Sequence, residues 1–272
     1  MSSVTARVEE VKQPRGGYLK PSLFEVFVRD DGIELFEEEN INPGLVGTVV
    51  DYLTRYKQMN GFKKVSGVAE IDALFGTFTL CLEGAEIAEK VGKKGSFEEA
   101  QELLKGITSK NVETAITSAC KLATYDLWKR NPLIAMTRSG TEDINPNQET
   151  IRNIAVMVKR GLDFFKDYGP VIESGFTFEE KGYTEIVDSG DGDYLTKDTL
   201  WDFKVLRSRI TSKHTLQLLM YWIMGRHSGQ AAFKSISNLG FFNPRQNTVH
   251  LLDAEKIPED VIAIVERDVI CY

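Results

Sequence analysis

The sequence predicts an α/β (α+β) fold with a mixed central β-sheet flanked by helices. The chain has 272 residues, of which 42% are hydrophobic and 27% charged, as in ordinary globular proteins. Short apolar segments with strand character follow one another closely between residues 171 and 206, and segments with a helical apolar period precede and follow them. Strands bordered by long helices bury their apolar faces in layers. We therefore expect one domain over residues 1–272.

The N-terminal segments are expected to form a hairpin and a helix. Residues 1–17 lack an apolar core, so they predict a frayed end and no signal peptide. Residues 22–37 predict a β-hairpin that turns at Asp31-Gly32. A helix is expected to start at Asn42-Pro43-Gly44 and to reach Tyr56, because apolar residues recur there at helical spacing. No run of eighteen apolar residues exists, so we expect no membrane span, and the cytoplasm is the expected compartment.

The middle of the chain is expected to be helical. Residues 65–130 predict several helices: one over 78–91, one capped by Ser96 with Glu99 in a capping box, and one over about 111–129. Residues 131–149 contain two Asn-Pro steps and predict a linker. We interpret 58–148 as a helical insertion that shapes a substrate channel or serves only as scaffold.

The C-terminal half predicts the sheet. A helix over 149–168 ends at Gly169-Pro170, and a second helix follows Thr211. The expected strands are 171–179, 183–188, 191–195, 199–206, 234–243 and 247–253, and the last helix is expected over 258–268.

Two carboxylates and a lysine fall on one predicted hairpin. Asp193 precedes the turn Thr196-Lys197-Asp198, and Asp202 and Lys204 follow it. Side chains alternate along a strand, so Asp202 and Lys204 share a face. Folding back at the turn brings Asp193 level with or near Asp202. Each residue taken alone is typical of a solvated face or a turn.

The chemistry of this set points to a metal-dependent phosphodiester-cleaving site. Paired carboxylates at one sheet edge suit Mg²⁺ or Mn²⁺, which can activate a bound water. Lys204 can orient that water or stabilise developing negative charge. On the following helix, Lys213, Gln217 and Tyr221 form a polar stripe at i, i+4 and i+8.

The joint order of these residues resembles the PD-(D/E)xK nuclease superfamily, in its branch of RecB-type and lambda-exonuclease-type nucleases. The residues that match the G-x-x-D, D-x-K and Q-x-x-x-Y motifs are Gly190, Asp193, Asp202, Lys204, Gln217 and Tyr221. Gly192 stands where the superfamily name has proline. Upstream, Gly47-Thr48-Val49-Val50-Asp51 partly matches G-T-x-x-H, with aspartate in place of histidine.

The resemblance implies a restriction-endonuclease-like core, with its motifs in 170–253, and a magnesium-dependent deoxyribonuclease. Asp193, Asp202, Lys204, Gln217 and Tyr221 are then the catalytic residues. Asp193 and Asp202 would hold the metal, and either Asp51 or Glu173 would complete its site. Some RecB-type relatives carry an iron–sulfur cluster on four cysteines. This chain has three, which are expected to be buried free thiols, so no cluster is expected.

The charge balance bears on the partner. A net charge of −7 counts against general coating of nucleic acid. A local basic strip of Lys204, Arg207, Arg209, Lys213 and Arg226 surrounds the motifs. Arg207, Arg209 and Lys213 are expected to contact DNA, and an ordinary solvated surface is the alternative explanation of the strip. A protein partner or a homo-oligomer is also compatible with the sequence. The alternative function is a catalytically silent nuclease-fold module that binds nucleic acid or a protein.

Overall fold

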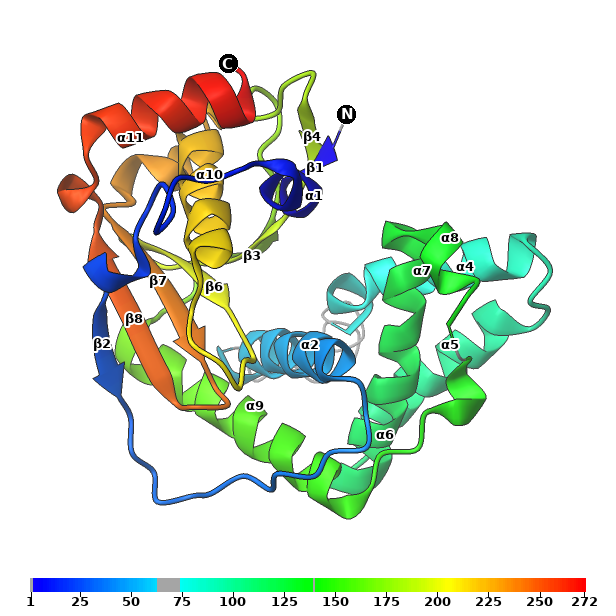
Figure 1. The fold of residues 1–272 in the computed structure, drawn as a ribbon. Helices are drawn as coiled ribbons and strands as arrows, with labels where there is room; N and C mark the ends of the chain where they lie inside the picture. The colour runs from blue at the N-terminus through cyan, green and yellow to red at the C-terminus, as the bar shows by residue number, and fades with distance from the viewer. Residues whose placement is uncertain (1, 63–73, 139) are drawn as a thin grey trace. The chain divides into compact units, whose positions relative to one another are not determined.

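The structure is a computed structural model that describes residues 2–62, 74–138 and 140–272 (Figure 1). The chain divides into two compact units. We call Met1–Asp31 with Phe164–Tyr272 the sheet unit, and Gly32–Asp163 the helical unit. The expected insertion at 58–148 falls within the helical unit, which begins earlier and ends later in the sequence.

The predicted mixed sheet flanked by helices is confirmed, and it lies in the sheet unit. Among the described residues it has six strands in the order β2-β8-β7-β6-β5-β3. Neighbouring strands are antiparallel except β6 and β7. A parallel pair needs a crossover connection, and α10 (Ser212–Ser228) supplies it. The strands are β2 (Glu25–Val28), β3 (Glu173–Phe176), β5 (Gly192–Leu195), β6 (Thr199–Phe203), β7 (Asn238–Asn243) and β8 (Thr248–Asp253).

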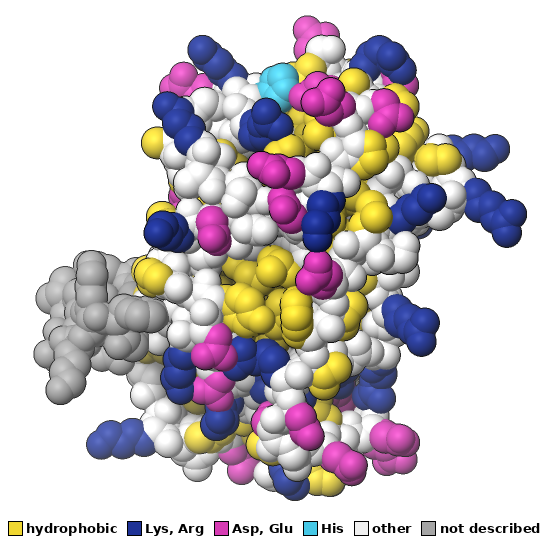
Figure 2. Space-filling model, turned by 90° about the vertical axis from the view of Figure 1, so that its left-hand side faces the viewer, with side chains coloured by type: hydrophobic (Ala, Val, Ile, Leu, Met, Phe, Trp, Pro, Cys, Tyr) yellow, Lys and Arg dark blue, Asp and Glu magenta, His cyan; other side chains and the backbone are white. Residues whose placement is uncertain are grey.

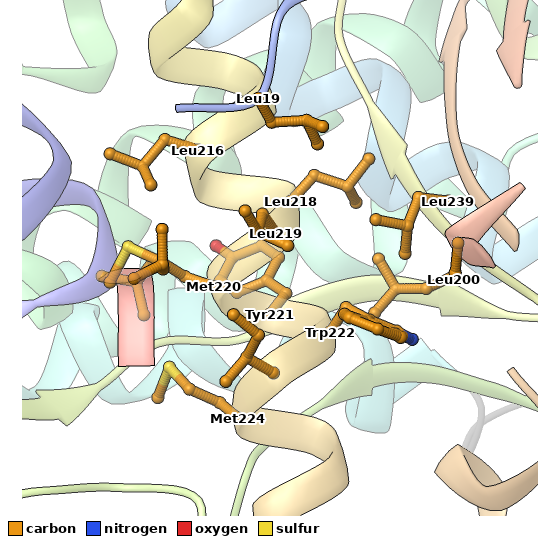
Figure 3. Packing of buried hydrophobic residues seen from close by; sticks show 14 of the residues in the cluster. Leu19, Leu200, Leu216, Leu218, Leu219, Met220, Tyr221, Trp222, Met224 and Leu239 are labelled. Carbon is orange, nitrogen blue, oxygen red and sulfur yellow. The ribbon is translucent and has the colours of Figure 1, made fainter. Parts of the chain in front are cut away.

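One face of the sheet packs against α10, which is buried on nearly all sides. Figure 3 shows its apolar side chains directed both toward the sheet residues Leu200 and Leu239 and away from them. A helix that is apolar all round must be covered on every side. The covering comes from α1 (Val4–Glu10), from α11 (Glu259–Ile264) and from the π-helical turn Val265–Ile270 that continues it.

The opposite face carries an aromatic cluster. Trp201 and Phe203 of β6 pack on Phe164 and Phe165, which lie near the end of α9 (Gln148–Tyr168). The ring centroids of Phe164 and Trp201 are 4.8 Å apart, edge to face, and those of Phe165 and Phe203 are 5.4 Å apart and stacked. Such pairs contribute roughly 0.5–1.5 kcal/mol each beyond burial. This cluster anchors β6 so that Asp202 must point to the α10 face.

The helical unit confirms the helical character expected for the described part of 65–130; residues 65–73 lie outside the described residues. α4 packs on both α5 and α7. The helix predicted over 111–129 is two helices joined by the 3-10 turn Ala123–Tyr125. The elements are α2 (Pro43–Phe62), α4 (Thr79–Lys90), α5 (Ser96–Ile107), α6 (Val112–Leu122), α7 (Asp126–Arg130), α8 (Pro132–Ala135), the 3-10 helix Thr141–Asp143 and α9 as far as Asp163.

The predicted hairpin over 22–37 is wrong. Its first half is β2, but β2 pairs with β8 and not with the residues that follow it. The backbone of those residues is bonded instead by side chains of α9: Arg160 Nη2 donates to the Ile33 carbonyl at 2.6 Å, and Asn153 bonds both backbone groups of Phe36 at 2.9 Å. With these groups satisfied, a second hairpin strand does not form.

The predicted fraying of the N-terminus is also wrong. Residues 4–10 form α1, whose N-cap Ser3 accepts a hydrogen bond from the Ala6 amide at 3.1 Å. Val4 and Val8 lie one turn apart and are 0% and 5% exposed. Their burial in the core around α10 holds the helix, although it is too short to be stable by itself.

Smaller differences have local causes. The N-cap of α5 is Gly95 at φ 82°, and the Glu99 carboxylate accepts from the hydroxyls of Tyr125 and Thr141, so the predicted capping box is wrong. The strand expected at 183–188 is β4 (Val187–Ser189), which pairs with β1 (Ser2–Ser3) outside the main sheet. No helix in the described parts of the chain has both the length and the apolar character needed to cross a bilayer.

Candidate active site

Asp193 and Asp202 face each other across the β5–β6 hairpin. The register pairs Tyr194 with Trp201 and Leu195 with Leu200. Its next position sets Asp193 opposite Asp202, as the sequence predicted. Tyr194 and Trp201 belong to the aromatic cluster, so both carboxylates lie on the other face, toward α10. An Asp193 carboxylate oxygen accepts a hydrogen bond from the Phe203 amide at 2.7 Å. This bond fixes the carboxylate of Asp193 at the end of β6.

Asp202 is a buried carboxylate with a cation beside it. The residue is 2% exposed, and the Lys204 ammonium lies 3.0 Å from Oδ1 and 2.8 Å from Oδ2. The Lys204 amide donates to the Phe242 carbonyl at 3.0 Å, so the backbone keeps its strand alignment past the end of β6. This alignment places Asp202 and Lys204 on one face, as predicted. Burial without such a partner would cost a carboxylate several kcal/mol.

Helix α10 adds the third contact to this group. Gln217 Oε1 accepts from the Lys204 ammonium at 2.8 Å, and Gln217 Nε2 donates to the Tyr221 hydroxyl at 3.1 Å. Tyr221 lies among the apolar side chains of α10 (Figure 3) and is 5% exposed. Its ring stacks on Phe178 with centroids 5.3 Å apart. The i, i+4 spacing of Gln217 and Tyr221 thus links the lysine to a ring held in the core.

The first turn of α10 is held by a capping box of Thr211 and His214. The Thr211 amide donates to His214 Nδ1 at 3.1 Å, so the imidazole acts as an acceptor. Burial, followed by the positive charge of Lys204, lowers the pKa of His214 to about 4, while Glu9 acts in the opposite direction. At neutral pH His214 is therefore uncharged and acts as the hydrogen-bond acceptor that caps α10.

Helix α1 also contributes to the site, which the sequence did not predict. Gln217 Nε2 donates to the Thr5 hydroxyl at 3.1 Å, and the Lys213 ammonium forms an ion pair with Glu9. Gly190, the glycine of the G-x-x-D motif, has φ 154°, and a Cβ there would lie 2.8 Å from a methyl carbon of Val4. Glycine is therefore needed both for its backbone angle and for the approach of α1. No local pattern in the sequence signals these contacts.

The two alternative third acids differ in where they lie. Register places Glu173 opposite Leu195, two residues along β5 from Asp193. Glu173 therefore lies roughly 7 Å from Asp193 along the strand direction. It is also on β3, which is one strand further from Asp202 than β5 is. Asp51 lies on α2 in the helical unit, where its carboxylate pairs with Arg55 at 2.7 Å. The structure brings Asp193, Asp202, Lys204, Gln217 and Tyr221 together in the sheet unit.

The predicted DNA-contacting residues lie on and after the loop that follows β6. Arg207 and Arg209 are exposed on this loop, and Lys213 is exposed in the first turn of α10. The loop is tied to the β7–β8 turn, since Gln246 Nε2 donates to the Arg207 carbonyl at 2.9 Å. These cations thus follow directly on the strand that carries Asp202 and Lys204.

The donor set at the site suits a small hard cation. In the described part of the chain, no group of three or more His, Cys, Asp or Glu side chains is placed to hold a metal ion. Asp193 and Asp202 are a pair of oxygen donors on one face, and magnesium sites in proteins often use only one or two carboxylates with waters and substrate phosphates. The residues present therefore fit Mg²⁺ or Mn²⁺.

The cysteines lie apart from this site. Cys81 and Cys120 are buried free thiols in the helical unit, and Cys271 is a partly buried free thiol near the end of the chain. Burial raises the pKa of Cys120 to about 12. Comparisons of the chain with protein-family models, curated proteins and solved structures found no match.

Proposed function

We propose that this chain is a metal-dependent nuclease with a restriction-endonuclease-like core that hydrolyses phosphodiester bonds of DNA. The observation that carries the proposal is the Lys204 ammonium, bonded at once to the buried carboxylate of Asp202 and to Gln217. A buried acid and a lysine on one strand, with a second acid opposite, are a costly arrangement for a purely structural role. Buried charged side chains that gather around one cation occur often at functional sites.

Asp193 and Asp202 would hold the cation, Mg²⁺ or Mn²⁺. Such an ion, when bound, lowers the pKa of a coordinated water and offsets negative charge on the phosphate. The formal charges of Asp193, Asp202 and Lys204 leave the group negative, which favours cation binding. The Phe203 amide, bonded to Asp193 at 2.7 Å, holds one donor in place before any ion binds.

Lys204 is the residue that would act on the reacting phosphate. Asp202 and Gln217 fix its ammonium from two sides, so its position costs little further ordering when substrate binds. A fixed cation stabilises the charge that develops on the phosphoryl oxygens. Gln217, itself held by Tyr221 and Thr5, positions this lysine.

Arg207, Arg209 and Lys213 would guide the DNA strand to the site. They are exposed cations on the loop and helix turn that follow Lys204. Phosphate contacts of this type position a strand without reading its sequence. The free cysteines fit the reducing environment of the cytoplasm, where we propose that the protein acts.

Cleavage of end-labelled DNA, single- and double-stranded, linear and circular, tests the proposal. Wild type would be assayed with Mg²⁺, Mn²⁺ or EDTA beside Asp202→Asn and Lys204→Met, which keep side-chain size. Asp188→Asn is the matched control, since Asp188 is an exposed acid on β4. We expect metal-dependent cleavage that falls at least about a hundredfold in both site variants and is unchanged in the control.

Two results would count against the proposal. Cleavage that persists in folded Asp202→Asn would place any activity elsewhere. No cleavage by folded wild type with any metal would favour the alternative, a catalytically silent module that binds nucleic acid or a protein. The net charge of −7 is the observation that favours a protein partner in that case.

A further inference from the structure

The edge strand β2 leaves apolar side chains exposed. It is the first strand in the sheet order, with β8 on one side only. Val26, Phe27 and Val28 are 55%, 43% and 72% exposed. Figure 2 views the molecule from the side on which β2 lies in Figure 1 and shows hydrophobic side chains gathered near the middle of that face. An apolar edge strand is a template for pairing with another strand.

The backbone groups of β2 alternate between β8 and the outside. The Arg29 amide donates to the Asn247 carbonyl at 2.8 Å, and the Asn247 side chain donates to the Arg29 carbonyl. Both groups of Arg29 therefore point toward the β7–β8 turn. In an antiparallel ladder this direction repeats every second residue. Phe27 accordingly bonds toward β8, and the amides and carbonyls of Val26 and Val28 point outward.

The side chains of β2 are divided between the two sheet faces. Phe27 pairs with Val249, which belongs to the aromatic cluster, so Phe27 lies on the α9 face. Glu25 and Arg29, two residues away on either side, share that face. Arg29 confirms this, since its guanidinium pairs with Asp167 of α9 at 2.7 Å. An acid, a phenyl ring and a base thus stand in line on one face of the edge.

We propose that two copies of this chain pair through β2, antiparallel, about a two-fold axis at Phe27. Phe27 then meets its own copy, Val26 meets Val28, and Glu25 meets Arg29. The two Val26–Val28 pairs each exchange two backbone hydrogen bonds, using the groups that point outward. The interface is isologous, as in most homodimers. The proposal is independent of the nuclease function.

Charge complementarity selects this partner and this register. An axis at Val26 would set Phe27 against Glu25, and an axis at Val28 would set it against Arg29. The axis at Phe27 places opposite charges together on both flanks. Glu25 now pairs with Lys256, and both side chains are more than half exposed, whereas Arg29, which is 23% exposed, pairs with Asp167, which is 62% exposed. The exposed Glu25–Lys256 pair is weak, so Glu25 can exchange it for Arg29 of the other copy at little cost. The charges set register, while backbone bonds and apolar contact supply affinity.

Disulfide trapping tests the register directly. In Phe27→Cys the two cysteines face each other across the axis, within the Cα separation that a disulfide accepts. In Val26→Cys the two cysteines lie two residues apart along the pairing direction, beyond that reach. Under mild oxidation we expect covalent dimers of Phe27→Cys and none beyond the wild-type background for Val26→Cys. A mixture of Val26→Cys and Val28→Cys should yield heterodimers.

Sedimentation velocity over a concentration series tests the dimer without cross-linking. Val28→Pro removes an outward amide donor from each copy and keeps the β2–β8 bonds, whereas Val28→Thr keeps shape and donor. We expect a concentration-dependent wild-type dimer whose dissociation constant rises about tenfold or more in Val28→Pro, from two lost hydrogen bonds. Val28→Thr should change it less. Circular dichroism checks folding, and the cysteine variants carry the test if Val28→Pro misfolds.

Three outcomes overturn the proposal. A wild type that stays monomeric at every concentration shows that β2 does not pair. If folded Val28→Pro forms a dimer of unchanged affinity, the dimer uses a surface other than the β2 edge. Equal cross-linking of Phe27→Cys and Val26→Cys shows random collision, not the register at Phe27. None of these outcomes depends on DNA cleavage.

Discussion

Replacing Lys204 by methionine isolates the energetic role of the cation beside Asp202. Methionine keeps the length and apolar stem of lysine but leaves the 2%-exposed Asp202 without its ammonium. Removing one partner of a fully buried pair costs roughly 3–5 kcal/mol. The Lys204 side chain is 20% exposed, so water offsets part of the loss. We expect the free energy of unfolding to fall by about 2–3 kcal/mol, below the fully buried value.

The matched control is Lys256→Met. The Lys256 ammonium lies 3.0 Å from Glu25, close to the separation in the buried pair, but both side chains are more than half exposed. The same substitution there should cost only about 0–1 kcal/mol. The two ion pairs therefore have similar nitrogen–oxygen distances and differ mainly in burial.

Urea unfolding followed by tryptophan fluorescence measures both variants. Trp201 and Trp222 lie in the sheet unit and Trp128 in the helical unit, so a Trp128→Phe background makes the signal report on the sheet unit. Midpoints at constant m-value then give the stability difference. Equal losses in Lys204→Met and Lys256→Met, within about 0.5 kcal/mol, would show that burial does not make this ion pair costly to break.

Thr5, His214 and Val8 each offer a further test of the contacts around the site. Thr5→Val should lower the cleavage rate about 3–10 times, because Gln217 loses a hydrogen-bond acceptor worth roughly 1 kcal/mol. Thr5→Ser keeps the hydroxyl and should cleave at the wild-type rate. Equal rates for the two variants would show that α1 does not support the site. The folded pKa of His214, about 4, lies below its ordinary 6.5. The unfolded chain therefore binds a proton that the fold does not, and stability should fall as pH drops from 6.5 to 4, by at most about 3 kcal/mol and less after solvent screening. His214→Gln, which keeps the capping acceptor, should flatten that loss in urea midpoints measured across pH, and an unchanged slope would contradict it. Val8→Ala should cost about 1–3 kcal/mol by leaving a cavity under α1, read from the thermal midpoint against an exposed Val112→Ala control.

The site residues could be predicted because each depends on a short-range period. A strand alternates its side chains, so Asp202 and Lys204 had to share a face, and the turn at 196–198 had to bring Asp193 opposite Asp202. A helix repeats every 3.6 residues, so Gln217 and Tyr221 had to lie one turn apart. The burial of Trp201 and Phe203 followed from the same alternation. These relations hold in any fold that keeps the local structure.

Other features depend on contacts between distant segments and have no local pattern. The hairpin expected over 22–37 failed because β2 pairs with β8, while Arg160 and Asn153 bind the backbone that follows β2. The N-terminus is ordered because the core around α10 has room for Val4 and Val8, and a segment of seven helical residues gains its stability only from that burial.

Local patterns along the chain were enough to predict the mixed sheet, the hairpin that carries the two acids, and the helix that follows. Only the packing of distant segments buries Asp202 against Lys204, brings Gln217 to that lysine, and bonds Thr5 to Gln217 across 212 residues of sequence. The difference lies in the range over which each kind of interaction acts. Backbone periods act over a few residues, whereas burial and long-range hydrogen bonds exist only once distant segments have packed together.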